Sequence, residues 1–548
     1  MSTPTYPKHK NKDETTYRAH GWWTGVTLGD VIDKTADVFP NKEGLVDDRS
    51  RLTFAEVRAN VDRLALGLLD LGIKKGDAVL LQLPNWAEYV YSYFAMQKIG
   101  AIPVILISGY KQLEVGHLAN LTQAKAWIVP ERYRKIDYTS FMGDVRKANP
   151  QLKNIIFVRS ENKAGGDAIN FESLLDRDVT AKDRNRLELA KPLPTDVCHV
   201  VPSGGTTGLP KGIPRTHNDY ICNVEYLHKG WEMNTTDACL VIVPVGHNLA
   251  VLNVVGSLLF AYKLVLSDST RPADICKLIE DEKITYMPSV PSLVRRIMEA
   301  PEMGNFDLTS LRKISAGGEP STPDLIQEVY RKLHCTYINE FGMTEGLLCR
   351  SQLTDDIETI CSTVGRATCP YDEVRIIDRE GKKLPAGVDG ELAAKGPGIF
   401  AGYLLAAGAK DQSFTKDGFF RTGDQAQMDA QGYIKITGRI KDIIIRGGEN
   451  ISPAQVEEIL CGHKEIADAA VIGMPDKDLG ERVCAFVRLV PGAKLSDTDI
   501  VTFMEANGAS KLLIPERFEF VDRFPMTQAG KHDKKLLKKE LVERLGLK

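Results

Sequence analysis

The sequence predicts an α/β protein with a large N-terminal domain of stacked α/β subdomains, a β-rich subdomain and a small α+β C-terminal domain. Strand-like and helix-like segments alternate from residue 28 to about residue 299, which indicates layered and largely parallel sheets. Short strands separated by glycine turns follow over residues 374–438, and a second short α/β pattern begins after residue 441. A chain of 548 residues is also too long for one ordinary core, so two or more domains are expected.

Hydrophobic periodicity predicts the individual elements of the large domain. Apolar residues at helical spacing predict helices at 28–37, 54–71, 86–99, 273–281 and 291–299, with another before residue 126. Short apolar runs predict strands at 77–83, 101–107, 126–129, 155–158, 197–201 and 263–266.

The remainder of the chain has a different pattern of predicted elements. Short strands are predicted at 374–377, 390–394 and 433–437, followed by a helix at 453–460, strands at 469–473 and 482–489, and a helix at 498–505. Charged residues interrupt the apolar strands at 438–442. We therefore expect the domain boundary there, dividing the chain into residues 1–440 and 441–548.

Composition excludes several classes of protein. The net charge of −3 provides no basic field for nucleic acid or an anionic membrane surface. The polar, lysine-rich N-terminus does not resemble a secretory signal, and no apolar run approaches the ~20 residues that span a bilayer. Ten scattered cysteines lack zinc-like spacing, which favours a cytoplasmic protein with reduced thiols.

A Gly/Ser/Thr-rich segment from Ser203 to Lys211 follows the strand predicted at 197–201. Its glycines allow backbone N–H groups to face an anion, and its hydroxyls and lysine complete a cradle for a polyphosphate. The spacing differs from a Walker A loop, because Leu209 and Pro210 separate the last glycine from the lysine. Taken alone, the segment is equally compatible with a flexible surface turn. The candidate phosphate-binding residues are Ser203, Gly204, Gly205, Thr206, Thr207, Gly208 and Lys211.

Three distant segments add candidate ligands for a nucleotide. Thr344 and Glu345 follow a glycine turn, where the carboxylate suits Mg²⁺ and the hydroxyl suits a phosphate, although a capping box or an ordinary turn has the same pattern. Asp424 is predicted in a tight turn that suits ribose hydroxyls or a structural Asx-turn. Lys531 lies at a glycine turn near the C-terminus, beside lysines that fit a solvated helix face.

In this order and over about residues 25–540, these segments resemble the adenylate-forming superfamily of acyl-CoA synthetases, peptide-synthetase adenylation domains and luciferases. Within it, the chain looks most similar to the 2,3-dihydroxybenzoate–AMP ligase branch and its aryl or alicyclic acid–CoA ligase relatives. The segments that carry this likeness are 211–220, 246–248, 341–347 and 369–373.

The resemblance implies an acyl-CoA synthetase-like fold with a mobile C-terminal domain and two half-reactions, which use ATP, Mg²⁺ and coenzyme A or a carrier-protein phosphopantetheine. It implies that Lys531 bridges the acid and the α-phosphate. It also implies that rotation at the hinge residue Lys441 brings Gly447 and Gly448 to a pantetheine tunnel. The alternative for Lys441 is a surface lysine at the domain boundary. It further assigns Thr344 to the α-phosphate, Glu345 to Mg²⁺, Gly317, Gly318, Glu319, Asn339, Glu340 and Phe341 to adenine, Asp424 to ribose, and Arg439 to ribose or phosphate.

The resemblance also implies an acid pocket formed by His247, Asn248, Leu249, Asn253, Gly318, Gly342 and Leu347, with His247 as a gate or wall. Dihydroxybenzoate enzymes have an aromatic residue after the His-Asn pair and small hydroxyl residues a few places on. This chain has Leu249 and then Leu252-Asn253 at those places. Because a buried polar group without a partner costs about 1–3 kcal/mol, the change favours an unhydroxylated, benzoate- or cyclohexanecarboxylate-like acid. Dihydroxybenzoate and salicylate remain alternatives.

Because the predicted pocket departs from that of dihydroxybenzoate enzymes, free coenzyme A is favoured as acceptor over a carrier protein acting in trans. Two rivals stay open: an adenylate-forming enzyme with oxidative, luciferase-type second chemistry, and a non-catalytic nucleotide-binding scaffold. The presence of Lys211, Glu345, Asp424, Arg439 and Lys531 weighs against the scaffold.

Overall fold

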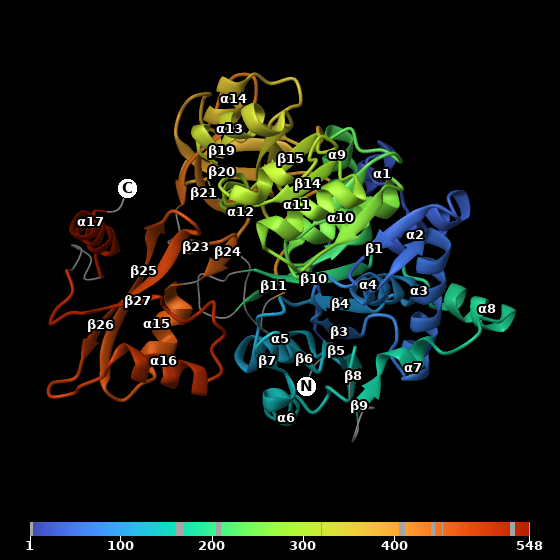
Figure 1. Cartoon of the computed structure of the whole chain (residues 1–548), viewed down its shortest axis with the longest axis horizontal. Coiled ribbons are helices and arrows are strands. Elements are labelled where there is room, and N and C mark those ends of the chain that lie inside the picture. Colours follow the sequence, from blue (N-terminus) through green and yellow to red (C-terminus); the bar gives the residue numbers. More distant parts are fainter. Residues whose placement is uncertain are drawn as a thin grey trace.

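The computed structural model describes residues 4–160, 168–203, 210–318, 321–404, 412–439, 444–451, 453–525 and 532–546 (Figure 1). Two large sheets form the body of the N-terminal domain. The first has nine strands in the order β18 (Arg366–Ala367), β17 (Leu348–Arg350), β16 (Thr336–Gly342), β15 (Lys313–Ala316), β14 (Tyr286–Ser289), β12 (Ala238–Val241), β13 (Lys263–Leu266), β1 (Glu43–Val46) and β2 (Arg51–Thr53). The second has seven, in the order β11 (Lys211–Thr216), β10 (Val197–Ser203), β4 (Ile102–Ile105), β3 (Ala78–Leu81), β5 (Ala126–Pro130), β8 (Asn154–Val158) and β9 (Ala168–Asn170).

Both sheets are parallel in their centres and antiparallel only towards their edges, as the alternation of strands and helices predicts. The helices of the large domain are α1 (Asn11–Ala19), α2 (Leu28–Val38), α3 (Phe54–Asp70), α4 (Ala87–Ile99), α5 (Gln112–Thr122), α6 (Thr139–Ala148), α7 (Phe171–Leu175), α8 (Ala181–Ala190), α9 (His217–Gly230), α10 (Asn248–Leu259), α11 (Pro272–Glu282), α12 (Pro291–Met298), α13 (Pro323–Leu333) and α14 (Ile357–Ser362), with a 3₁₀ turn η1 (Pro301–Asn305). A short hairpin joins β6 (Arg132–Tyr133) to β7 (Ile136–Asp137).

One core joins the two sheets. It contains residues of β3, β4, β12 and β13 together with the buried faces of α2, α3, α4, α9 and α10. Capping boxes begin several of these helices: the Thr27 and Thr53 hydroxyls accept from the backbone N–H groups of Asp30 and Glu56, whose side chains accept from the threonines in return. These caps explain why the starts of α2 and α3 lie at the residues that the sequence predicts.

The β-rich subdomain is a four-stranded antiparallel sheet of β19 (Glu373–Ile377), β20 (Gly390–Lys395), β21 (Phe420–Met428) and β22 (Ile434–Arg439). Its buried face packs around Ile376, Leu392 and Phe420. The same core includes Ile213 of β11 and Leu347, so the subdomain is attached to both large sheets.

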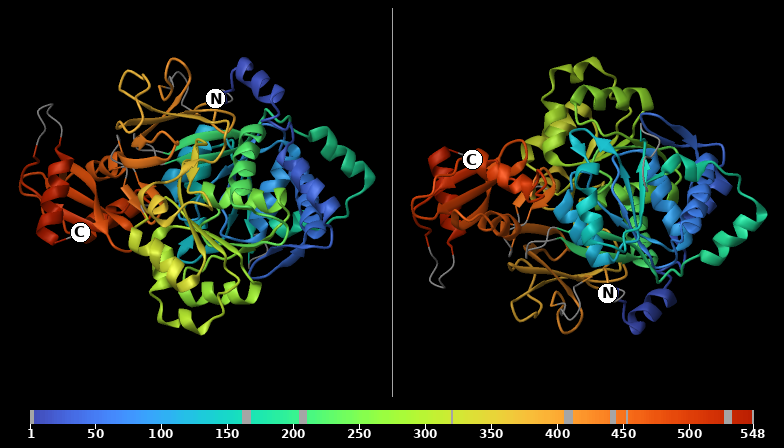
Figure 2. Two further views of the ribbon diagram at one scale, coloured as in Figure 1. Left: turned by 90° about the horizontal axis from the view of Figure 1, so that it is seen from above. Right: turned by 90° about the horizontal axis from the view of Figure 1, so that it is seen from below.

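The small C-terminal domain projects from one end of the molecule (Figures 1 and 2). Its sheet consists of β24 (Glu449–Ile451), β23 (Ile444–Arg446), β26 (Gly480–Leu489) and β25 (Ile466–Asp476), and β27 (Arg517–Phe520) also pairs with β26. Helices α15 (Pro453–Cys461) and α16 (Asp497–Ala506) share one core with this sheet, whereas α17 (Lys534–Leu545) contributes Leu537 and Leu541 to a second core. The long β25–β26 hairpin is therefore covered on both faces, as expected for α+β layers.

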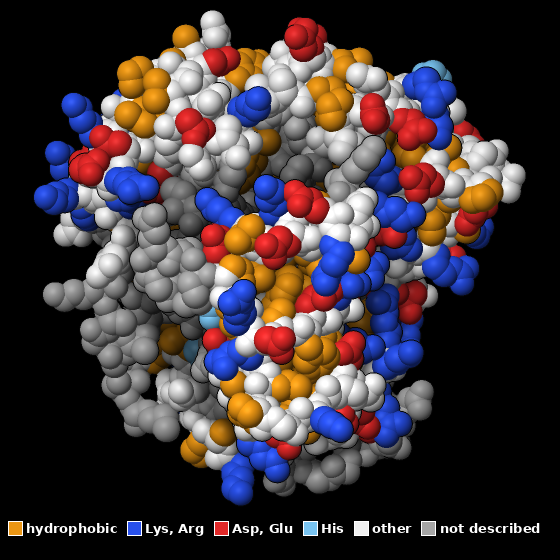
Figure 3. Space-filling view, turned by 90° about the vertical axis from the view of Figure 1, so that its left-hand side faces the viewer, with side chains coloured by type: hydrophobic (Ala, Val, Ile, Leu, Met, Phe, Trp, Pro, Cys, Tyr) orange, Lys and Arg blue, Asp and Glu red, His pale blue; other side chains and the backbone are white. Residues whose placement is uncertain are grey.

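The end of the molecule formed by the small domain carries Lys/Arg and Asp/Glu side chains interspersed with one another (Figure 3). No helix among the described residues combines the length and the apolar character that a bilayer crossing requires. All ten cysteines are free thiols, and most of them are buried.

One local expectation was wrong, and one helix was not predicted. The apolar run after His247 forms helix α10, which the hydrophobic pattern does not predict because the helix is buried on nearly every side. Asp424 lies inside strand β21, opposite Arg439 of β22, rather than in a tight turn. The irregularity that the sequence signals there is Gly423, which has a φ of 76° immediately before the aspartate.

Candidate active site

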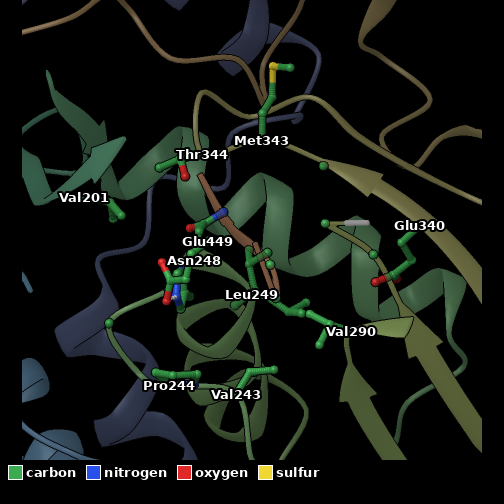
Figure 4. A pocket seen from close by; sticks show the side chains of 18 of the residues that line it. Val201, Val243, Pro244, Asn248, Leu249, Val290, Glu340, Met343, Thr344 and Glu449 are labelled. Atoms are coloured by element: carbon green, nitrogen blue, oxygen red, sulfur yellow. Dashed lines mark hydrogen bonds and ion pairs between the residues drawn. The ribbon is translucent and has the colours of Figure 1, made fainter. Parts of the chain in front are cut away.

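A cavity of about 490 Å³ opens between the large domain and the small domain. From the large domain it is lined by residues of β10, β11, β16, β17, β21, α10 and α12 and by the residues that follow β14 and β15, and from the small domain by Gly447, Gly448, Glu449, Asp478 and Leu479 (Figure 4). The parallel strands β14, β15 and β16 all end at this cavity. In open α/β sheets, ligands bind outside the carboxyl ends of such strands.

One side of the cavity is polar. The Lys211 ammonium lies 4.5 Å from the ring centroid of Tyr403, and the Tyr403 hydroxyl donates to Glu345 Oε1 at 2.5 Å. Burial raises the pKa of Glu345, and the bond from Tyr403 offsets this only in part. Because Mg²⁺ uses one or two carboxylates together with phosphate and water oxygens, the donor set fits that ion.

Thr344 is held in place by a buried arginine. Arg215 is completely buried and donates from Nη1 to Thr344 O at 2.8 Å, and from Nη2 to Gly398 O and Asn223 Oδ1, both at 2.7 Å. Its Nε donates to Asp219 Oδ1 at 2.7 Å. Burial alone would raise the pKa of Asp219, but the arginine, together with other partners, lowers it to about 2. Arg215 therefore joins β11, α9 and the Thr344 turn into one unit.

Sequence reasoning did not single out Arg215 or Tyr403. The four-residue spacing of Arg215 and Asp219 is not a helical signal, because Arg215 lies in β11 and Asp219 in the first turn of α9. No local pattern identifies Tyr403, which reaches Glu345 from 58 positions away.

The residues predicted for adenine are divided by the structure. Gly317, Gly318, Glu340 and Phe341 line the cavity. Asn339 does not, because its Nδ2 donates to Ile360 O at 3.1 Å and to Thr363 O at 2.9 Å on the other face of the sheet. Side chains of successive strand residues alternate between faces, which separates Asn339 from Glu340.

The residues predicted for ribose lie on neighbouring strands. Asp424 is buried and lines the cavity together with Thr422 and Gly423. Its backbone N–H donates to Thr422 Oγ1 at 3.0 Å, which fixes the strand beside the carboxylate. Arg439 pairs with it across β21 and β22, although the description does not extend to the Arg439 side chain.

The predicted acid pocket is also divided. His247, Asn248, Leu249, Gly318 and Gly342 line the cavity, together with the apolar side chains of Leu227, Val243, Leu252 and Val290. Asn253 does not: it is fully buried and its Nδ2 donates to Leu249 O at 2.9 Å. Leu347 lies in the core of the β-rich subdomain, and its neighbour Leu348 lines the cavity instead.

A charged pair closes the cavity from the small domain. His247 Nε2 lies 2.5 Å from Glu449 Oε1. Burial lowers the pKa of His247, but the Glu449 carboxylate more than offsets this, so that the net shift is upwards. Asn248, the next residue, accepts from the Tyr220 hydroxyl at 3.0 Å. The pair connects the start of α10 with β24.

Two glycines meet at the same domain boundary. Gly318 and Gly448 have φ angles of 83° and 84°, a region that favours glycine. A Cβ at Gly318 would lie 3.7 Å from the Cα of Gly448, and a Cβ at Gly448 would meet Val290 Cγ1 at 3.0 Å. The small domain therefore approaches the cavity through backbone atoms at this point.

Several predicted residues lie outside the described ranges. These are Lys531, Lys441, Glu319, Gly204, Gly205, Thr206, Thr207 and Gly208, and the side chain of Ser203 also lies outside the description. Ser203 and Lys211, which flank the glycine-rich segment, face each other across β10 and β11. Next to Lys531, His532 Nε2 lies 3.0 Å from Asp468 Oδ2, and α17 begins at the outer end of the small domain (Figure 1).

Comparisons with known proteins agree with this architecture. A family profile for AMP-binding enzymes matches residues 32–404, and one for the AMP-binding enzyme C-terminal domain matches residues 455–531. The chain is 36% identical to the 2,3-dihydroxybenzoate-AMP ligase of Bacillus subtilis over 533 residues, which cover 97% of this chain and 96% of that protein. It is 33% identical to the 2-hydroxy-7-methoxy-5-methyl-1-naphthoate–CoA ligase of Streptomyces carzinostaticus over 528 residues, 95% of this chain and 94% of that one.

Among solved structures, the apo structure of Mycobacterium smegmatis MbtA matches with a TM-score of 0.72 and 30% identity, over 98% of each chain. The likeness thus extends over both domains. With matched profiles over most of its length and relatives above 30% identity that cover nearly all of it, this chain belongs to the AMP-binding, adenylate-forming enzyme family.

Proposed function

We propose that the protein activates a cyclic carboxylic acid, aromatic or alicyclic, with ATP to form acyl-AMP, and then transfers the acyl group to the thiol of coenzyme A. The observation that carries this proposal is a single cavity with two different ends. Lys211, Glu345 and Asp424 offer groups for a nucleotide, whereas Leu249 and its apolar neighbours offer a wall for a hydrocarbon ring.

In the first half-reaction, a carboxylate oxygen of the acid attacks the α-phosphorus of ATP, and the bond to pyrophosphate breaks. Both reactants are anions, so the protein contributes mainly charge neutralisation and positioning. Lys211 and the Ser203–Gly208 segment hold the outer phosphates, Thr344 holds the α-phosphate, and Asp424 with Arg439 holds the ribose. Mg²⁺, held by Glu345, would neutralise phosphate charge. Lys531 spans the attacking carboxylate and the α-phosphate.

In the second half-reaction, the thiol sulfur attacks the acyl carbon, the bond to AMP breaks, and the thiol proton is lost to solvent. Gly447 and Gly448 have no side chain that would obstruct a narrow thiol arm at the cavity. Rotation about Lys441 would exchange this arrangement for one that delivers Lys531, as hinge residues commonly do.

The apolar wall supports an acid whose ring has no hydroxyl facing α10. Leu249 and Leu252 line that side of the cavity, and Asn253 donates its amide hydrogen to Leu249 O instead of facing it. A phenol hydroxyl there would lose its hydrogen bonds to water without gaining a partner. Benzoate and cyclohexanecarboxylate are therefore the preferred skeletons.

A second candidate is a 2,3-dihydroxybenzoate- or salicylate-AMP ligase that loads a carrier protein in trans. It is favoured by the 36% identity to a 2,3-dihydroxybenzoate-AMP ligase. Coenzyme A and a carrier protein present the same phosphopantetheine arm, so an arm-binding surface serves either acceptor.

The test is pyrophosphate release with ATP, Mg²⁺ and a panel of acids, followed by thioester formation with coenzyme A or with an aryl carrier protein. We expect benzoate or cyclohexanecarboxylate to support release, and coenzyme A to accept the acyl group without a carrier. Preference for 2,3-dihydroxybenzoate with transfer only to the carrier protein would favour the second candidate. Absence of pyrophosphate release with every cyclic acid would refute both.

Replacing Gly448 with alanine is expected to slow the thioester step about tenfold or more, corresponding to about 1.4 kcal/mol. The added Cβ would meet Val290 and strain a positive φ at the mouth of the cavity. Gly492→Ala is the matched control, because Gly492 has a φ of 86° but no neighbour within 4 Å of an added Cβ. Single-turnover transfer from preformed acyl-AMP provides the measurement. Equal slowing in both variants would mean that backbone strain alone is responsible.

Removing the interdomain pair with Glu449→Gln is expected to slow thioester formation about three- to tenfold at pH 6.5, as for a pair worth about 1 kcal/mol. The pKa of His247 is raised by Glu449, so the pair is fully formed below the ordinary histidine value of about 6.5 and is lost as pH rises through the raised value. The ratio of wild-type to variant rates, in which thiol ionisation cancels, should therefore fall towards one at high pH. A ratio that does not change with pH would contradict this role.

A further inference from the structure

Glu340 and Arg350 are direct cross-strand partners of β16 and β17. Their side chains therefore share one face of the sheet. Strand alternation puts Glu340 on the same face as Ile338, which belongs to the core between the two large sheets, and opposite to Asn339. The sequence places a carboxylate and a guanidinium next to an otherwise apolar end of the cavity.

Three polar atoms of this cluster make no hydrogen bond of good geometry among the described residues. These are Glu340 Oε1, Arg350 Nε and Trp231 Nε1, each enclosed from solvent. Arg350 is 5% exposed, and its Nη1 donates to Ser351 O at 3.2 Å rather than to the neighbouring carboxylate. Buried polar groups in native proteins are nearly always paired, so such a group needs an explanation.

The Glu340 side chain borders the cavity while part of it is enclosed. The residue is half-buried and lines the cavity, whereas its Oε1 is fully enclosed. Burial raises the pKa of Glu340 to about 8, an effect that Arg350, Ser315 and Trp231 offset only in part. The carboxyl group is therefore largely protonated at neutral pH, and the cluster satisfies its hydrogen-bonding groups incompletely.

Glu340 lies away from the groups proposed for the phosphates. Figure 4 shows Glu340 on the opposite side of the cavity from Thr344, with Leu249 and Val290 between them in this view. Leu249 and Val290 belong to the apolar wall proposed for the ring of the acid. A substituent on the ring edge that faces β16 would therefore meet the carboxyl group of Glu340.

We propose that Glu340 determines which acid is accepted, by taking a hydrogen bond from an amino or hydroxyl substituent on the ring edge that faces β16. Arg350 is a positioning residue that stabilises the ionised form of this carboxyl group. The inference rests on the proposed function and refines it: the ring lacks a hydroxyl towards α10 but carries an N–H or O–H donor towards β16. The sequence resemblance instead assigns Glu340 to adenine, and the two roles lead to different kinetics.

The test compares ring-substituted benzoates of similar size in ATP–pyrophosphate exchange. For each ring position, the amino and hydroxy acids are compared with the methyl acid, which has no donor. We expect an amino or hydroxy isomer at one position to exceed its methyl counterpart at least tenfold in kcat/KM. The relative rates of amino and hydroxy acids identify the source of the donor.

Two variants assign the effect to Glu340. Glu340→Met, which has no acceptor oxygen, should bring the donor-to-methyl ratio close to one. Glu340→Gln keeps an acceptor oxygen but cannot ionise, so it should retain part of the ratio and lose its dependence on pH. In the wild type, the ratio should rise as pH passes through about 8, because the ionised carboxylate is the stronger acceptor. Glu328→Gln on α13, a half-buried carboxylate away from the cavity, is the matched control.

The outcomes separate the possible failures. If no substituted acid exceeds its methyl counterpart, or if the ratio survives in Glu340→Met, the inference is wrong while the proposed function stands. If Glu340→Gln instead raises the KM for ATP by the same factor with every acid, the residue serves the nucleotide. If no cyclic acid supports exchange in the wild type, the proposed function itself fails. Should Glu340→Met not fold, as judged by its thermal unfolding, the pH dependence of the ratio in Glu340→Gln decides.

Discussion

Replacing Lys531 with alanine is expected to slow acyl-AMP formation by about 10²–10³-fold, the effect of losing one positioned charge that stabilises a transition state. A carboxylate that attacks a polyphosphate needs a cation between the two anions, and the resemblance to adenylate-forming enzymes assigns this role to Lys531. Thioester formation from preformed acyl-AMP should be affected far less, because the proposed arrangement for that step does not use this lysine.

The measurement is single-turnover formation of acyl-AMP, followed separately from transfer to coenzyme A. Lys535→Ala is a suitable control, since Lys535 is exposed on α17 and lies four residues away. If Lys531→Ala formed acyl-AMP at the wild-type rate, the proposed first half-reaction would be wrong. If both lysine variants lost activity alike, general charge rather than position would be responsible.

Replacing Arg215 with methionine is expected to lower the free energy of unfolding by about 3–5 kcal/mol, because it leaves the buried Asp219 carboxylate without its main partner. The variant also loses the bonds that hold Thr344 O and Gly398 O, so acyl-AMP formation should fall with stability. The pKa of Asp219 is lower in the folded protein than in the unfolded chain. The pair therefore makes its full contribution to the free energy of unfolding above about pH 4, and this contribution is lost as pH falls towards 2. Urea unfolding at pH 7 measures its full value.

Arg331→Met provides the comparison for this measurement. Arg331 also forms an ion pair, with Glu328, but its side chain is 71% exposed. Such a surface pair contributes about 0–1 kcal/mol. Similar losses of stability in the two variants would contradict the argument from burial. Adding Asp219→Leu to Arg215→Met should recover part of the loss, because a hydrophobic replacement of both partners removes the unpaired charge.

Local signals were sufficient for most of the fold. The predicted helix at 54–71 corresponds to α3, and the strand at 263–266 corresponds to β13 residue for residue, because each follows a clear hydrophobic period. The apolar run of α10 shows where that method fails. A helix buried on nearly all sides has no polar face, so its period of 3.6 is not visible in the sequence.

The candidate site shows a similar division. His247, Asn248 and Leu249 all line the cavity, because the start of α10 carries them there together. Asn253 does not, since its amide is used inside the helix by Leu249 O, a local bond that motif comparison does not reveal. The alternation of Asn339 and Glu340 was predictable from the strand period, whereas the contact of Tyr403 with Glu345 depends on tertiary packing alone.

The contact of Gly318 with Gly448 has a mechanical consequence. Where two domains meet through interlocked side chains, any turn of one against the other must first withdraw those side chains. Here the two domains face each other through main-chain atoms, so the small domain could turn at this point without withdrawing a side chain. The neighbouring His247–Glu449 pair is the contact that would have to break first. Elsewhere at the boundary, Leu113 of α5 packs against the core of the small domain, so switching between half-reactions would require both release of the charge contact and withdrawal of this side chain.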